Sequence, residues 1–249
     1  MTLAVVQSSD AIWQSLVREA EDAAAADGLL ARSLETAIFQ RAGLADAIAH
    51  QIGRRLADGG DTDRLFARAA RDAFTTDPEL ARAASLDLQS VILRDPASPR
   101  LLPVLTMQKG FVALEAWRVS NWLWRQDRKD QALLAQSAIS RMLQVSIHPS
   151  ATIGASVFLD HATGIVVSAL AEISDEVTIL QNVTVGRQDG GASPKIGRGV
   201  LLSAGSTVIG AVTIGDFAKI GANSLVTENV PPGCTAVGIP ARLVNCSDA

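Results

Sequence analysis

The chain has 249 residues, of which 48% are hydrophobic and 19% charged, and its net charge at neutral pH is −4. This apolar fraction is high enough to offset chain entropy, which excludes a disordered protein, and the length suits one large domain or two modest ones. The 22 basic and 26 acidic residues leave no basic excess, which argues against nucleic acid as the main partner.

No run approaches ~18 uninterrupted apolar residues, and the first ten residues contain no basic segment. We therefore expect no membrane span and no secretion signal, and we predict a cytoplasmic protein. Cys234 and Cys246 are the only cysteines, too few for a disulfide framework or a zinc quartet, so no metal is expected.

Residue types change abruptly near Ser146. Residues 1–146 contain 17 basic and 18 acidic side chains and all four tryptophans, whereas residues 147–249 contain 5 basic and 8 acidic ones. Valine, isoleucine, glycine, serine and threonine dominate the second segment. We therefore predict a helical domain over 1–146 and a domain of different architecture over 147–249.

Apolar residues at helical spacing dominate the first segment. The predicted helices cover 11–26, 33–41, 44–57, 61–74, 78–94, 105–126 and 131–143. Asp10 and Asp77 are the expected N-caps of the first and fifth helices, with Pro78 in the first turn of the fifth. Gly28 is expected to end the first helix. Without a basic groove, the tryptophans are expected in the core or at a subunit contact rather than stacked on bases.

An aliphatic residue recurs at six-residue steps through the second segment. The positions are Ile147, Ile153, Leu159, Ile165, Ile173, Ile179, Val185, Ile196, Leu202, Val208, Ile214, Ile220 and Val226. The step is eight between Ile165 and Ile173 and eleven between Val185 and Ile196. A period of six predicts a parallel β-helix, in which each short strand forms one side of a triangular coil. The eleven-residue step predicts a loop over 186–195, and such loops often bind ligands in repeat proteins.

Several segments resemble the serine O-acetyltransferases of cysteine biosynthesis, over nearly the whole chain. They are Arg94-Asp95-Pro96-Ala97, Lys109-Gly110-Phe111, Trp122-Leu123-Trp124, Ile147-His148-Pro149, Leu159 to Val167, Pro194-Lys195-Ile196, Ala218 to Ala222 and Gly238 to Arg242. Hexapeptide repeats alone indicate only a broad acyltransferase class, whereas the run Asp-His-Ala-Thr-Gly-Ile-Val-Val is far more specific. The predicted fold class is therefore α+β, with an all-helical N-terminal domain followed by a left-handed parallel β-helix, the handedness being implied by the resemblance.

The resemblance implies an acyl-CoA-dependent O-acyltransferase that moves an acetyl group from acetyl-CoA to the hydroxyl of serine or of a related small amino acid or alcohol. It also implies homotrimers with active sites between adjacent β-helices, commonly paired into hexamers, as dimers of trimers, through the helical domains. A hydroxyl is a poor nucleophile at neutral pH, so a positioned base must take its proton during attack on the thioester.

His161 is the candidate base, because the ordinary pKa of histidine lies near neutral pH. We expect His50 to lie on a helix surface and His148 to be structural. Asp95 and Asp160 match acidic residues that hold the acceptor in the resembling family. The positions that match its CoA contacts are Ala204, Gly205, Lys219 and Ala222, and Lys219 and Arg242 are expected to meet the nucleotide phosphates.

Three departures from the family pattern fall at the expected site. Ser146 occupies the position of an aspartate that orients the catalytic histidine; a serine orients the ring but cannot offset its charge. Ala192-Ser193 replaces an Arg-His pair associated with the acceptor carboxylate, so we expect Arg187 to be a replacement clamp, with Ser193 and Ser146 also at the acceptor site. Ser168-Ala169-Leu170 replaces a Gly-Glu-Thr run.

Two classes of function stay open at this point. One is an active O-acyltransferase, with N-acylation of an amine as a weaker variant, and the other is a weakly catalytic paralogue that acts as a ligand sensor or assembly partner. The tail, Cys246-Ser247-Asp248-Ala249, lacks the terminal isoleucine by which family members dock into a sulfhydrylase. A sulfhydrylase partner is therefore not assumed.

Overall fold

The computed structural model describes residues 7–57, 59, 63–187 and 191–246. The chain forms two compact units, Met1–Glu115 and Ala116–Ala249, and the division falls inside helix α7 (Lys109–Arg125). The change from helix to strand comes between Leu143 and Val145, close to the predicted boundary. The assignment of 1–146 and 147–249 as separate domains stays a prediction.

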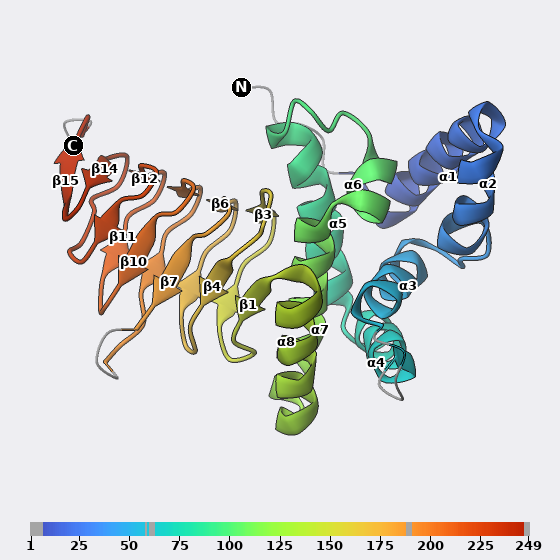
Figure 1. Cartoon of the computed structure of the whole chain (residues 1–249), viewed down its shortest axis with the longest axis horizontal. Helices are drawn as coiled ribbons and strands as arrows, with labels where there is room; N and C mark the ends of the chain where they lie inside the picture. The colour runs from blue at the N-terminus through green and yellow to red at the C-terminus, as the bar shows by residue number, and fades with distance from the viewer. Residues whose placement is uncertain (1–6, 58, 60–62, 188–190, 247–249) are drawn as a thin grey trace. The chain divides into compact units, whose positions relative to one another are not determined.

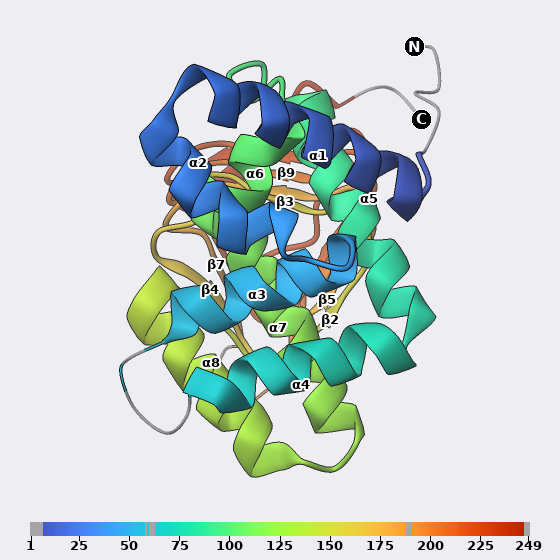
Figure 2. The same ribbon diagram turned by 90° about the vertical axis from the view of Figure 1, so that its right-hand side faces the viewer.

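The described part of the first unit is entirely helical. Before α7 its elements are α1 (Ser9–Ala26), α2 (Gly28–Leu34), the π-helical turn η1 (Glu35–Phe39), α3 (Leu44–Leu56), α4 (Asp63–Thr76), α5 (Pro78–Arg94) and α6 (Leu101–Met107). Helices α3 and α4 lie side by side (Figure 2). The predicted cap of α5 is confirmed: Asp77 accepts a hydrogen bond from the N–H of Leu80 at 3.2 Å, and Pro78 follows in the first turn.

Three local predictions in this unit are wrong, each because another residue satisfies the helix end. Ser8, not Asp10, caps α1, through a 3.2 Å hydrogen bond from the N–H of Ala11. Gly28 begins α2 instead of ending α1, because the Asp27 carboxylate caps α2 through the N–H of Leu29. The predicted 105–126 helix is two helices, since Gln108 is extended and closes α6 with a hydrogen bond to the Pro103 carbonyl.

The second unit contains the end of α7, the helix α8 (Lys129–Leu143) and a β-helix of short strands. The first eight strands are β1 (Val145–Ile147), β2 (Thr152–Ile153), β3 (Phe158–Leu159), β4 (Ile165–Val167), β5 (Glu172–Ile173), β6 (Thr178–Ile179), β7 (Thr184–Gly186) and β8 (Lys195–Ile196). The remainder are β9 (Leu201–Leu202), β10 (Thr207–Ile209), β11 (Thr213–Ile214), β12 (Lys219–Ile220), β13 (Leu225–Val226), β14 (Thr235–Gly238) and β15 (Ala241–Val244).

Every third strand joins the same sheet, as a triangular coil requires. The first sheet has the order β1-β4-β7-β10-β13, the second β11-β8-β5-β2, and the third β15-β14-β12-β9-β6-β3. All strand pairs are parallel except β14 and β15, and the successive coils stack along one direction (Figure 1). The fold class predicted from the six-residue period is confirmed.

The register corrects one detail of that period. Ile147 pairs with Val167 and Val167 with Val185, so the residue of β4 that continues the six-residue series is Val167, whereas Ile165, which is also buried, pairs with Val145. The eight-residue step therefore lies between Leu159 and Val167. The corresponding step from Ile179 to Val185 is six, so the corner after β3 contains two extra residues.

The inward side chains form the core of the β-helix, with Ile173, Ile179 and Ile220 almost fully buried.

Cys234, just before β14, forms a disulfide with Cys246, just after β15. The two cysteines are too few for a disulfide framework, and their single bond closes the open end of the β14–β15 hairpin. Residues 188–190 of the predicted loop and 247–249 of the tail lie outside the described residues.

Candidate active site

His161 lies on the two-residue insertion in the corner after β3. Asp160 and Leu180 occupy equivalent positions in successive coils. The N–H of Asp160 bonds to the Ile179 carbonyl, and the N–H of Leu180 bonds to the Leu202 carbonyl. Past the corner, the N–H of Asn182 bonds to the Thr163 carbonyl. His161 and Ala162 are thus the extra pair, and both adopt the left-handed conformation, with φ of 56° and 62°.

The insertion projects the imidazole away from the coil. The side chain of His161 is 72% exposed, and its Nε2 lies 3.7 Å from Asp160 Oδ1. That distance is longer than a hydrogen bond, which leaves space for a ligand group to pair with either atom. An exposed imidazole beside a carboxylate is suited to taking a proton from a bound hydroxyl.

Three of the predicted CoA-binding residues share this corner. Leu202 pairs with Ile220 and the N–H of Asn223 bonds to the Ala204 carbonyl, so Ala204 and Ala222 stack in successive coils on the edge that carries His161. Gly205 lies beside Ala204, with φ of 71°. Small side chains leave this edge open for an extended ligand to lie against the backbone.

The two predicted phosphate-binding cations lie nearer the C-terminal end of the β-helix. Lys219 is the exposed first residue of β12. Arg242 is exposed on β15 and lines a hollow of about 610 Å³ together with Glu228 and Asn229. Neither residue is part of the column formed by Ala204 and Ala222, although β12 ends only two residues before Ala222.

Two predicted acceptor residues are already hydrogen-bonded. Ser146, in β1, accepts a long hydrogen bond from Gln136 Nε2 of α8, at 3.4 Å. Ser193 Oγ donates to the Ala169 carbonyl at 2.6 Å and so fastens the end of the predicted loop to the preceding coil. Arg187 is exposed at the start of that loop.

Asp95 belongs to the first unit. It follows α5, and its carboxylate accepts hydrogen bonds from the N–H of Ala97 at 2.9 Å and from Ser98 Oγ at 2.7 Å. These bonds hold it in a turn before proline. Its part in acceptor binding stays a prediction.

Gln181 was not predicted as a site residue. It lies between Thr163 and Ala204 in the corner column, since the N–H of Gly205 bonds to its carbonyl. Its side-chain Oε1 is buried and has no hydrogen-bond partner in the part of the chain that the structure describes. Sequence periodicity gives no signal for it, because a glutamine at a corner fits an ordinary coil equally well.

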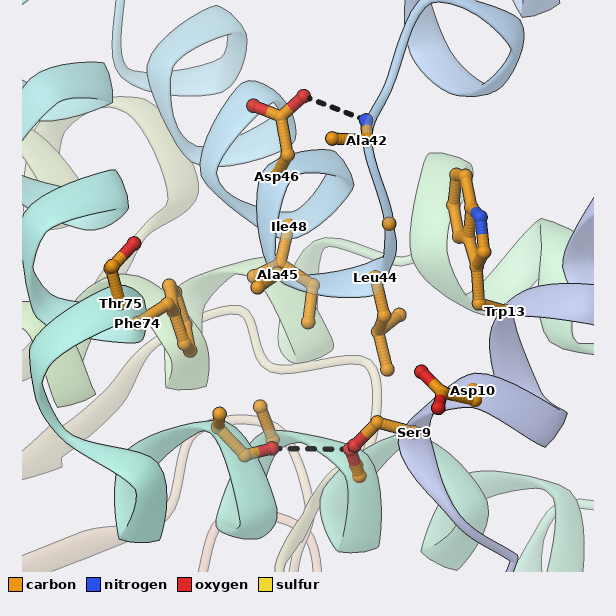
Figure 3. A pocket seen from close by; sticks show the side chains of 14 residues that line it. Ser9, Asp10, Trp13, Ala42, Leu44, Ala45, Asp46, Ile48, Phe74 and Thr75 are labelled. Atoms are coloured by element: carbon orange, nitrogen blue, oxygen red, sulfur yellow. Dashed lines mark hydrogen bonds between the residues drawn. The ribbon is translucent and has the colours of Figure 1, made fainter.

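A cavity of about 390 Å³ in the first unit contains none of the predicted site residues (Figure 3). Its lining includes Asp10, Trp13, Leu44, Asp46 and Phe74.

None of the helices in the described part of the chain is long and apolar enough to cross a membrane. Over the same residues, no three His, Cys, Asp or Glu side chains are grouped in a way that would hold a metal ion.

Comparisons with known proteins identify the family of the chain. Residues 12–116 match the family model "Serine acetyltransferase, N-terminal", and residues 193–228 match "Bacterial transferase hexapeptide (six repeats)". The serine acetyltransferase of Salmonella typhimurium is 39% identical over 236 residues, which cover 94% of this chain and 86% of the relative.

Solved structures give the same result. The soybean serine acetyltransferase complexed with serine has a TM-score of 0.91 at 40% identity, covering 95% of this chain and 98% of that one. A serine acetyltransferase in complex with CoA has a TM-score of 0.92 at 37% identity, covering 95% of this chain and 100% of that one.

Proposed function

The chain belongs to the serine acetyltransferase family, and we propose that it transfers the acetyl group of acetyl-CoA to the hydroxyl of serine. The serine acetyltransferase relatives match nearly the whole of this chain, so the alternative of a weakly catalytic paralogue that acts as a ligand sensor or assembly partner is not favoured. The observation that carries the proposal is the placement of His161. Its imidazole projects on an insertion at the edge where Ala204 and Ala222 leave room for an extended donor.

In the proposed reaction, the His161 imidazole takes the hydroxyl proton as the serine oxygen attacks the thioester carbonyl. The tetrahedral intermediate collapses with cleavage of the carbon–sulfur bond. The imidazolium returns its proton to the departing thiolate, so the products are the O-acetyl ester and free CoA. Asp160, 3.7 Å from Nε2, stabilises the transient imidazolium and receives the ammonium group of the acceptor.

Acetyl-CoA is the co-substrate, and its pantetheine arm would lie along the corner formed by Ala204, Gly205 and Ala222. Lys219 and Arg242 would meet the nucleotide phosphates as exposed cations. The homotrimer, its pairing into a dimer of trimers and the cytoplasmic location stay predictions.

Replacement of His161 tests the proposal. Purified wild-type chain should release CoA thiol from acetyl-CoA only when serine is present. His161→Ala should lower kcat by ~10²-fold or more, because general-base catalysis contributes about that much, while equilibrium binding of CoA is retained. A wild-type chain inactive on serine would contradict the proposed function, and a fully active His161→Ala variant would contradict the assignment of the base.

A further inference from the structure

His148 is held as a neutral hydrogen-bond donor. Its Nδ1 accepts a hydrogen bond from the N–H of Ser150 at 3.1 Å and lies 2.8 Å from Ser150 Oγ. The Ser150 oxygen accepts the N–H of Leu170 at 3.3 Å, so its own proton is available for Nδ1. An Nδ1 that accepts two hydrogen bonds carries no proton, which places the proton of the neutral ring on Nε2.

The turn that carries His148 is fixed by side chains of α7. Trp117 Nε1 donates to the His148 carbonyl at 3.1 Å, and Asn121 Nδ2 donates to the carbonyls of Pro149 at 2.8 Å and Ala151 at 3.1 Å. The Trp124 ring packs edge-on against the imidazole, with 5.3 Å between the ring centroids. Because the backbone of the turn is hydrogen-bonded and Trp124 packs against the ring, the imidazole points its Nε2–H in one direction. Such a fixed donor is suited to ligand binding, unlike a mobile histidine on the surface.

The strand register brings a cation to the same corner. Ile147, Val167 and Val185 pair in successive coils, so the next residues, His148, Ser168 and Gly186, stack in one column at the C-terminal ends of the strands. Arg187 follows Gly186 directly. Burial first, and the positive charge of Arg187 second, lower the pKa of His148 below its ordinary value, so the ring stays neutral beside the guanidinium.

A fixed neutral N–H next to a guanidinium fork is a binding arrangement for a carboxylate. Resting on the proposed function, we propose that His148 Nε2–H and Arg187 together bind the carboxylate of the amino-acid acceptor. His148 is thereby a substrate-binding residue instead of the structural histidine expected from the sequence. It supplies a ring donor where Ala192-Ser193 offers none.

This corner is not the corner of His161. His148 stacks just beyond the C-terminal ends of β1 and β4, whereas His161 precedes β4. The two histidines thus lie at opposite ends of the strands of the first sheet, at two different corners of the triangular coil. In the homotrimer expected from the family resemblance, an acceptor that touches both histidines would contact His161 of one copy of the chain and His148 with Arg187 of another.

The test compares serine with serinamide, which keeps the hydroxyl and the ammonium but lacks the carboxylate charge. In His148→Ala and in Arg187→Ala, the ratio of kcat/KM for serine to kcat/KM for serinamide should fall by ~10-fold, as expected for a lost charge-assisted hydrogen bond. The loss should appear in the KM for serine, with kcat and the KM for acetyl-CoA unchanged. His148→Gln should keep most of the discrimination, because its amide N–H reaches near the position of Nε2.

His50→Gln is the matched control, since His50 is a half-buried histidine of the first unit with no predicted role in the site; it should leave the ratio unchanged. Thermal unfolding of each variant separates folding defects from binding defects. An active wild type whose discrimination survives in both alanine variants would overturn this inference while leaving the proposed function intact. Loss of discrimination in His148→Gln equal to that in His148→Ala would also overturn the donor role.

Discussion

At the scale of single residues, two histidines of one β-helix have opposite environments. His161 is exposed on an insertion, and its Nε2 lies 3.7 Å from Asp160 Oδ1. His148 is half-buried, and its Nδ1 is hydrogen-bonded to both the backbone N–H and the side-chain hydroxyl of Ser150. The first environment suits a base and the second a fixed donor, so the chemistry of each ring follows from its hydrogen bonds rather than from residue type.

The lowered pKa of His148 predicts how stability depends on pH. In the unfolded chain the histidine pKa has its ordinary value of 6.5, and in the folded chain it is lower. Below that ordinary value the unfolded state therefore binds more protons than the folded state, and the free energy of unfolding falls as the pH decreases toward the folded pKa.

Gln does not titrate, so His148→Gln should lose less stability on acidification than the wild type. Differential scanning calorimetry at about pH 7.5 and about pH 5.5 should show the difference in Tm between the two proteins moving in favour of the variant. A difference in Tm that stays constant between the two pH values would show that His148 titrates alike in both states.

At the scale of elements, the six-residue period predicts the β-helix and the long connection between β7 and β8, of which residues 188–190 lie outside the described residues. The period alone puts the two-residue insertion after Ile165 instead of before it. Ile165 and Val167 are both aliphatic, and only the strand register shows that Val167 aligns with Ile147. The resemblance to a known family points to His161, whose role as the base stays a prediction, but it does not give the reason for the exposure of this side chain. The role of His148 depends on hydrogen bonds to Ser150 and on a cation from a distant coil, and no spacing in the sequence reports either.

The corner beside His161 depends on a close approach between neighbouring coils. Gly205 has φ of 71°, and a Cβ there would collide with Asn223 Oδ1 of the next coil. Gly205→Ala combines strain with this collision, so we expect it to lower the free energy of unfolding by ~1–3 kcal/mol. Gly28→Ala is the control, since a Cβ at Gly28 would meet no atom within 4 Å. Urea titrations that give the two variants the same midpoint would contradict this account of the corner.

At the scale of the whole molecule, the β-helix presents two different half-sites along one sheet. In the proposed function, the edge with His161, Ala204 and Ala222 would provide the base and the surface for acetyl-CoA. The opposite edge provides His148 and Arg187. A ring of identical chains joined through unlike surfaces brings such edges together at each interface, which is how a heterologous contact closes into a trimer.

This arrangement predicts complementation between two damaged chains. In a mixed assembly, a site that takes His161 from a His148→Ala chain and His148 from a His161→Ala chain is intact, and random mixing of equal amounts gives about one such site in four. At serine concentrations far below KM, the co-expressed mixture should therefore exceed the mean activity of the two separate variants severalfold. Wild type co-expressed with the double variant His148→Ala/His161→Ala is the control for assembly. If the mixture has only the mean activity while the control contains mixed assemblies, both histidines act within one chain, and the shared site is wrong.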